Sequence, residues 1–194
     1  LSSIERVTAD DGSGDCSGSS CDYSGWTPPP SSAAVQIDIV QEPIPSSCGG
    51  CGCFIAGTKV LLENGTEKNI EDVTTDDILL TSSGKEEVMK RYHIPYTGLV
   101  YAFNGDENYF VTPTHPFMTT DGWKSLDPEG TKKESPDIDV SLLAVGDTLV
   151  RHNNETKVLT QLDSKEITTT VYNFGVNGTH EFYADGYLVH NVDT

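Results

Sequence analysis

The sequence predicts an all-β domain over residues 53–191, preceded by a flexible segment over residues 1–52. Within 53–191, apolar and polar residues alternate in short runs, and Asn-Gly or Asp-Gly pairs separate these runs. Such pairs supply the positive φ angles that two-residue hairpin loops need. No stretch keeps a helical period of 3.6 residues over three turns. We therefore expect antiparallel strands built into one compact unit.

The predicted strands follow one another at short intervals and meet at these turn pairs. Residues 127–136 contain two prolines and several charged side chains, and we interpret them as an exposed loop. Residues 73–80 and 143–150 share a pattern in which an apolar residue, a turn and an aspartate lead into a strand, which favours two similar halves. The alternating runs are 58–62, 98–103, 108–111, 171–176, 180–184 and 187–190, and the turn pairs are Asn64-Gly65, Asn104-Gly105, Asn177-Gly178 and Asp185-Gly186.

Charge and composition restrict the partners of the chain. The 194 residues include 12 lysines and arginines against 30 aspartates and glutamates, for a net charge of −18. We expect no nucleic-acid or anionic-membrane partner, because both require a basic surface. No apolar run approaches the roughly 18 residues of a membrane-spanning helix. Residues 1–52 are rich in Ser, Gly, Asp and Pro, a composition that cannot offset its ordering entropy and predicts a flanking linker.

Cys53 opens the β-domain and is the first candidate for chemistry. It follows Gly52, whose carbonyl carries no side chain to crowd an attacking group. A cysteine thiol can attack the carbonyl that precedes its own amide nitrogen and convert the peptide bond into a thioester. The reaction is intramolecular but uphill, so other groups must activate the amide and stabilise the oxyanion.

Two further clusters offer such groups. Thr112 and His115 lie in a turn bracketed by prolines, where the imidazole can donate to the departing amide nitrogen and the hydroxyl can hydrogen-bond nearby. His190-Asn191 ends the last predicted strand. An asparagine amide can attack its own backbone carbonyl and release the chain that follows, and His190 and His180 are candidates to assist. A cysteine at one border and an asparagine at the other match a domain that cuts its own boundaries.

These segments together resemble the Hint superfamily of inteins, bacterial intein-like domains and Hedgehog autoprocessing domains. The resemblance spans about residues 53–191 and implies a horseshoe-shaped fold with pseudo-two-fold symmetry. The segments that carry it are Cys53–Val60 with 64–65 and 70–73, Thr112–Phe117 with 121–123, and 171–176 with 180–186 and 189–191.

The resemblance also implies roles for individual residues. Cys53 is then the nucleophile of an N–S acyl shift, with Thr112 and His115 assisting, and His180 and His190 support cyclisation of Asn191.

Two of the residues that depart from the pattern of the family bear on the chemistry. Val192 follows Asn191, whereas a splicing intein presents Ser, Thr or Cys there, which favours cleavage over splicing at this junction. Asn173 stands where the family usually has an aspartate near the first cysteine. A neutral amide cannot act as a base, so the coupled step is expected to be slower.

The remaining cysteines precede Cys53, and Cys48-Gly49-Gly50-Cys51 has the spacing of zinc ligands. Because no matching Cys/His pair is nearby, free thiols are the simpler interpretation. A disulfide from Cys48 or Cys51 to Cys53 would remove the nucleophile and make the domain redox-sensitive. Cys48 is the better candidate for this pairing, since the ring through Cys51 would be strained.

The sequence thus predicts autocatalytic processing without a metal or organic cofactor. Cleavage is expected at the Gly52–Cys53 and Asn191–Val192 bonds, so residues 192–194 begin a second flanking segment. The partners are the flanking segments themselves and water or a small nucleophile, and a monomer is expected. Two alternatives stay open: full splicing that joins the flanking segments, and a β interaction module that does not process.

Overall fold

The computed structural model describes residues 52–191. The predictions made for residues 1–51, including the linker and the roles of Cys48 and Cys51, and those for Val192 lie outside the described residues. Strands make up most of the described part, with one short α-helix and two 3-10 turns, so the predicted all-β class is confirmed. No helix among residues 52–191 is long and apolar enough to cross a membrane.

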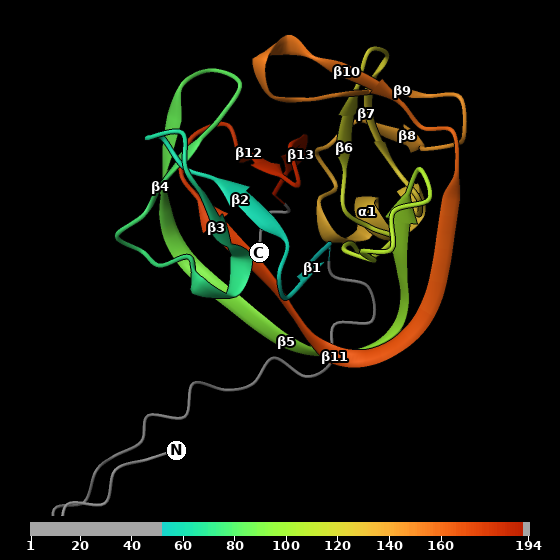
Figure 1. Ribbon diagram of the computed structural model, residues 1–194, viewed down its shortest axis with the longest axis horizontal. Coiled ribbons are helices and arrows are strands. Elements are labelled where there is room, and N and C mark those ends of the chain that lie inside the picture. Colours follow the sequence, from blue (N-terminus) through green and yellow to red (C-terminus); the bar gives the residue numbers. More distant parts are fainter. Residues whose placement is uncertain (1–51, 192–194) are drawn as a thin grey trace, which may run out of the picture. The chain divides into compact units, whose positions relative to one another are not determined.

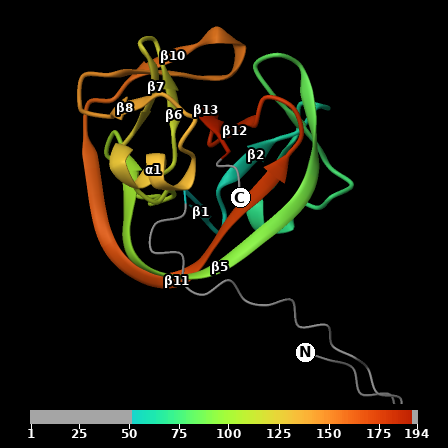
Figure 2. The same cartoon turned by 180° about the vertical axis from the view of Figure 1, so that it is seen from behind.

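The strands form two sheets that are antiparallel except for the parallel β7–β8 pair. One has the order β1-β11-β5-β4, and the other has β10-β9-β6-β13-β12-β2-β3, with β7 paired to β6 and β8 paired to β7. Figure 1 shows β5 and β11 running alongside each other as a long curved pair under two lobes, with β12 and β13 between the lobes, and Figure 2 shows the same horseshoe from behind. The strands are β1 (Phe54–Ile55), β2 (Lys59–Leu61), β3 (Glu67–Asn69), β4 (Ile78–Leu80), β5 (Lys85–Phe103), β6 (Phe117–Thr119), β7 (Gly122–Ser125), β8 (Val140–Leu142), β9 (Thr148–Val150), β10 (Thr156–Val158), β11 (Leu162–Val176), β12 (Glu181–Ala184) and β13 (Tyr187–His190); the helix is α1 (Pro128–Glu134), and the 3-10 turns are Ile70–Asp72 and His152–Asn154.

The long β5–β11 pair gives the molecule its curved base. The two strands pair continuously from Phe103↔Leu162 to Gly175↔Lys90, with a bulge before Val176. Their threonine-, valine- and tyrosine-rich sequences suit a strand because these side chains pack well on a pleated surface. The two ends of β11 therefore reach different lobes, and its C-terminal part pairs with β1 through Phe54↔Tyr172 and Ile55↔Val171.

Most predicted turns are present. Asp185 and Gly186 have φ angles of 47° and 77° and connect β12 to β13, which pair from Ala184↔Tyr187 onward. Positive φ at both central residues is what a tight type I′ turn requires.

The predicted hairpin at Asn177-Gly178 is wrong. Gly178 does adopt a positive φ of 85°, but β11 and β12 lie in different sheets. Asn177 donates its backbone N–H to the Glu87 carbonyl at 3.3 Å. The turn chemistry sets the local backbone, whereas the buried side chains of β12 direct that strand to β13 and β2 instead.

Residues 73–80 and 143–150, which share a sequence pattern, adopt the same local structure. Asp77 accepts a hydrogen bond from the backbone N–H three residues earlier at 2.6 Å and from Lys68 Nζ at 2.7 Å. Asp147 accepts from the backbone N–H three residues earlier at 2.8 Å and from Lys124 Nζ at 2.6 Å. In both cases a short strand with a fully buried central leucine follows. This equivalence is consistent with the pseudo-two-fold arrangement.

The interpretation of residues 127–136 as a loop is wrong, because they contain α1. Asp127 caps the helix by accepting a backbone N–H at 2.9 Å, and a proline occupies the first helical position. Thr131 is fully buried and donates to the Thr114 carbonyl at 2.7 Å. A helix of seven residues is too short to show a 3.6-residue period, so packing against the 112–117 turn determines it.

An aromatic core lies between the sheets and supports the site. Phe54, which directly follows Cys53, is fully buried, and its ring centroid lies 4.2 Å from that of His115. Burying rings of this size contributes a large part of the stability of such a domain. The core rings are those of Phe54, Phe103, Phe110, Phe117, Phe174, Phe182 and Tyr187.

Candidate functional site

The Gly52–Cys53 peptide bond lies inside the domain, held by the strand that follows it. β1 pairs with β11 through Phe54↔Tyr172, and the Cys53 carbonyl accepts the Thr112 N–H at 3.0 Å. The Cys53 side chain is 1% exposed and carries a free thiol. The bond is therefore part of the packed interior rather than a surface linker.

The Thr112 hydroxyl contacts the nitrogen side of this bond. Its Oγ1 accepts the Cys53 N–H at 2.8 Å and donates to the Cys53 carbonyl at 3.1 Å. Both residues are buried, so these hydrogen bonds are shielded from water. Thr112 can hold the amide nitrogen in place while the bond to Gly52 changes.

The Asn173 amide contacts the other side of the same bond. Its Nδ2 donates to the Gly52 carbonyl at 2.7 Å, and its Oδ1 accepts the Phe174 N–H at 2.8 Å. The second contact orients the amide so that its NH₂ group faces Gly52. A donor aimed at a carbonyl under attack can stabilise the oxyanion that forms. Sequence analysis judged Asn173 only as a base, and this donor geometry was missed.

His115 is fully buried beside these groups. Its pKa is lowered to about 3, chiefly by burial; the Gly52 backbone opposes this by favouring the protonated ring, and the nearby His190 contributes to the lowering. Neither ring nitrogen, however, meets hydrogen-bond geometry with any group in residues 52–191. Because its pKa is this low, the imidazole is neutral at physiological pH.

Asn191 reaches the same stretch of β11 from the other end of the domain. It is 1% exposed, and its Nδ2 donates to the Phe174 carbonyl. Its backbone N–H donates to the His180 carbonyl at 2.5 Å. Because Asn173 contacts Gly52 and the next residue contacts Asn191, neighbouring positions of β11 hold the two ends of the domain.

The two other predicted histidines flank Asn191. The ring centroids of His180 and His190 lie 6.1 Å apart, and the Trp123 ring packs edge-on against His190 at 5.2 Å. His180 adopts a φ of 59°, an uncommon backbone conformation for a residue with a side chain. It touches Asn191 through its carbonyl, and sequence reasoning had considered only its ring.

Electrostatics keep the Cys53 thiol protonated at rest. Burial raises the pKa of the thiol far above its ordinary value, and the negative charge of Glu134 raises it further. Thiolate formation must therefore be coupled to another proton movement or to a change in the surroundings.

Glu134, the last residue of α1, is a component of the site that sequence analysis missed. Its Oε2 accepts the Gly52 N–H at 2.9 Å. Burial raises the pKa of this carboxyl to about 7, hydrogen bonds from the Gly52 backbone and the Thr114 side chain oppose the rise, and Asp127 adds to it. The residue was one of many acidic side chains in a stretch interpreted as a loop, so no pattern distinguished it.

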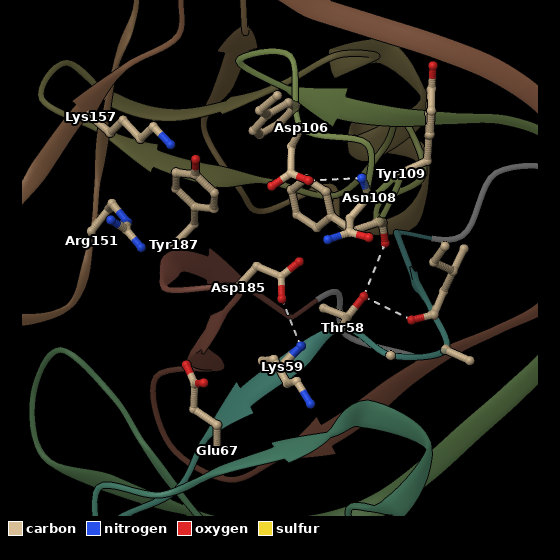
Figure 3. Close-up of a pocket in the computed structure, with 15 residues that line it drawn as sticks. Thr58, Lys59, Glu67, Asp106, Asn108, Tyr109, Arg151, Lys157, Asp185 and Tyr187 are labelled. Atoms are coloured by element: carbon tan, nitrogen blue, oxygen red, sulfur yellow. Dashed lines mark hydrogen bonds between the residues drawn. The ribbon is translucent and has the colours of Figure 1, made fainter.

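A separate cavity of about 400 Å³ is lined by residues 55–59 and by side chains that include Arg151, Asp185 and Tyr187. Figure 3 shows Arg151 and Lys157 near Tyr187 on one side, with Asp185 accepting the Lys59 N–H at 2.8 Å. None of the predicted site residues lines this cavity. Among residues 52–191 no cluster of three or more His, Cys, Asp or Glu side chains could hold a metal ion.

Comparison with solved structures identifies the fold. The crystal structure of the gp41-1 intein matches with a TM-score of 0.56 and 20% identity, over 72% of this chain and 98% of that one. A bacterial intein-like domain from Clostridium thermocellum matches with a TM-score of 0.54 and 23% identity, over 72% and 98%. A DnaB intein from Synechocystis sp. matches with a TM-score of 0.52 and 20% identity, over 73% and 99%.

No protein-family model matches the chain, and a search of curated proteins finds no match. The structural likeness nevertheless shows that residues 52–191 have the fold of inteins and bacterial intein-like domains, so the predicted Hint fold is confirmed.

Proposed function

We propose that residues 53–191 are a self-processing domain of intein-like type that breaks the peptide bonds at its own two borders. One observation supports this above all. The Gly52–Cys53 bond is buried with a donor on its carbonyl, Asn173, and a hydroxyl on its nitrogen, Thr112. A solvent-exposed linker would take its hydrogen bonds from water, whereas here two side chains that can also assist an acyl shift supply them.

The first step is an N–S acyl shift. Cys53 Sγ bonds to the Gly52 carbonyl carbon while the bond from that carbon to the Cys53 nitrogen breaks, and the thiol proton ends on the freed amine. Asn173 stabilises the oxyanion, and the buried His115 can carry the proton to the departing nitrogen because its neutral ring can both accept and donate. Water or a small thiol then opens the thioester and releases residues 1–52.

The second step is cyclisation of Asn191. Its side-chain nitrogen attacks its own carbonyl carbon, and the bond to the Val192 nitrogen breaks as that nitrogen takes up a proton. The hydrogen bonds to the Phe174 and His180 carbonyls hold the residue at the end of β13. Fixing the attacking and leaving groups in one place raises the rate of such an intramolecular reaction.

Cleavage at each border is the primary proposal, and the residue that follows Asn191 favours it over ligation of the two flanking segments. Val192 has no nucleophilic side chain to receive the acyl group. Splicing would have to join residues 1–52 to residues 192–194 by another route, and its product has a distinct mass.

Intact-mass spectrometry of the purified full chain over time tests the proposal. The wild type should release residues 1–52 when reductant is present. Cys53→Ala should abolish that release, whereas Cys48→Ala should keep it under reducing conditions. Asn191→Ala should block release at Val192, whereas Asn177→Ala, at an exposed turn, should not. A wild-type chain that stays intact under reducing conditions would mean a non-processing module and contradict the proposal.

A further inference from the structure

We propose that Glu134 positions Gly52 for the acyl shift by accepting its backbone N–H, so that the scissile carbonyl faces Cys53 and the Asn173 donor. This inference rests on the proposed function, since it assigns a role in the first step. Sequence analysis of the domain gave Glu134 no role, and the fold alone does not imply one.

Gly52, whose backbone N–H Glu134 accepts, needs contacts from other residues to fix its conformation. Gly52 has no side chain, and glycine is the residue with the greatest backbone freedom. Its N–H is held at 2.9 Å by Glu134 Oε2, and its carbonyl is held at 2.7 Å by Asn173 Nδ2. With the Thr112 contact to the Cys53 N–H, the peptide groups on both sides of Gly52 have fixed orientations.

The position of Glu134 is itself determined by the turn that carries Thr112 and His115. Asp127 at the start of α1 donates its backbone N–H to the Pro113 carbonyl at 2.9 Å. Thr131 donates to the Thr114 carbonyl at 2.7 Å, and the Thr114 hydroxyl bonds to Glu134. These hydrogen bonds join the helix to the turn. Their precision matters because a displacement of about 1 Å between reacting groups can cost on the order of a hundredfold in rate.

The close approach of α1 to this turn is visible at Gly130. A Cβ atom at this position would lie 2.6 Å from Thr114 Cγ2, a separation that real side chains do not tolerate. The glycine lets the helix backbone come near enough for the last residue of α1 to reach Gly52.

Three variants of the full chain test the proposal, each followed by the rates of release at both borders. Glu134→Ala removes the acceptor and should slow N-terminal release by about tenfold or more. Glu134→Gln keeps an oxygen that can accept the Gly52 N–H and should stay within about threefold of the wild type, given the usual size of hydrogen-bond effects. Glu129→Ala, on the exposed side of the same helix, should match the wild type.

Cleavage at Asn191 provides an internal control for folding. It should proceed at the wild-type rate in all three variants, because the hydrogen bonds of Glu134 within residues 52–191 go to Gly52 and Thr114 and not to Asn191. Equal N-terminal rates in Glu134→Ala and wild type would overturn the proposal, as would a Glu134→Gln variant as slow as Glu134→Ala. Loss of both cleavages with a lowered melting temperature would show a structural role and overturn it too. A wild type that releases nothing would instead contradict the proposed function, and this inference with it.

Discussion

Replacing Thr112 by valine tests how the Gly52–Cys53 bond is held, independently of any rate. Valine has nearly the same shape as threonine but lacks the hydroxyl. The change leaves the Cys53 N–H without its acceptor at 2.8 Å and removes the 3.1 Å hydrogen bond to the Cys53 carbonyl. That carbonyl keeps the Thr112 backbone N–H at 3.0 Å, so of these two Cys53 groups the N–H is the one that becomes unsatisfied.

The size of the effect follows from these contacts. A buried donor left without a partner costs about 1–3 kcal/mol, and both residues are 1% exposed. We therefore expect Thr112→Val to lower the free energy of unfolding by about 2 kcal/mol. Thr112→Ser keeps the hydroxyl and loses one methyl group, which should cost about 1 kcal/mol.

Urea denaturation followed by circular dichroism measures both variants. The measurement is made in a Cys53→Ala, Asn191→Ala background, so that processing does not change the species during the experiment. A valine variant within about 0.5 kcal/mol of its parent, the usual range of surface substitutions, would refute the assigned hydrogen bonds. So would a serine variant that loses as much stability as the valine variant.

Three further predictions concern the charges and donors around the site. Asn173→Ala and Asn173→Asp should each slow N-terminal release about a hundredfold at pH 8. The alanine removes the donor on the Gly52 carbonyl, and the aspartate replaces it with a negative charge. A gel time course measures the release, and an aspartate variant as fast as wild type would contradict the prediction. Because the pKa of His115 is lowered to about 3 in the folded chain, the unfolded chain binds more protons than the folded chain below about pH 6.5. The free energy of unfolding of the wild type should therefore fall faster from pH 6.5 to 4 than that of His115→Phe. Parallel plots of this free energy against pH for the two proteins would contradict the prediction. The pKa of Glu134 is raised to about 7, so its stabilising contribution is complete below about pH 4.5 and is lost as the pH rises through about 7. After allowance for the partial exposure of the carboxylate, the free energy of unfolding of Glu134→Gln should rise by about 1–2 kcal/mol relative to wild type between pH 5 and pH 8. No such rise would contradict this.

Short-range sequence patterns predicted the strand pairing correctly where the turn residues and the packing of the core favour the same pairing. At Asp185-Gly186 the turn residues favour a hairpin, and the flanking β12 and β13 pair as neighbours. At Asn177-Gly178 the same local signal is present, but the strands on either side belong to different sheets. A dipeptide determines local φ angles and carries no information on which distant strand will cover the next apolar side chain.

The prediction of the site began from a cysteine and an asparagine at the two borders of the β-rich stretch, because these residue types can break the adjoining peptide bonds. The structure joins Cys53 and Thr112 by hydrogen bonds and buries Asn191 at the C-terminal border, and the catalytic roles of these residues stay a prediction. Glu134 could not be predicted, because its contact with Gly52 spans 82 positions in the sequence. It depends on a seven-residue helix that only the packing against the 112–117 turn defines.

The acyl shift at Gly52 is tested most directly by trapping its product. The Asn191→Ala chain, freshly purified and incubated with an excess of a small thiol such as 2-mercaptoethanesulfonate, should yield residues 1–52 with the mass of the corresponding C-terminal thioester. Asn191→Ala combined with Cys53→Ala should yield no such species. Absence of the thioester from the chain that keeps Cys53, or its appearance in the chain that lacks it, would contradict the account.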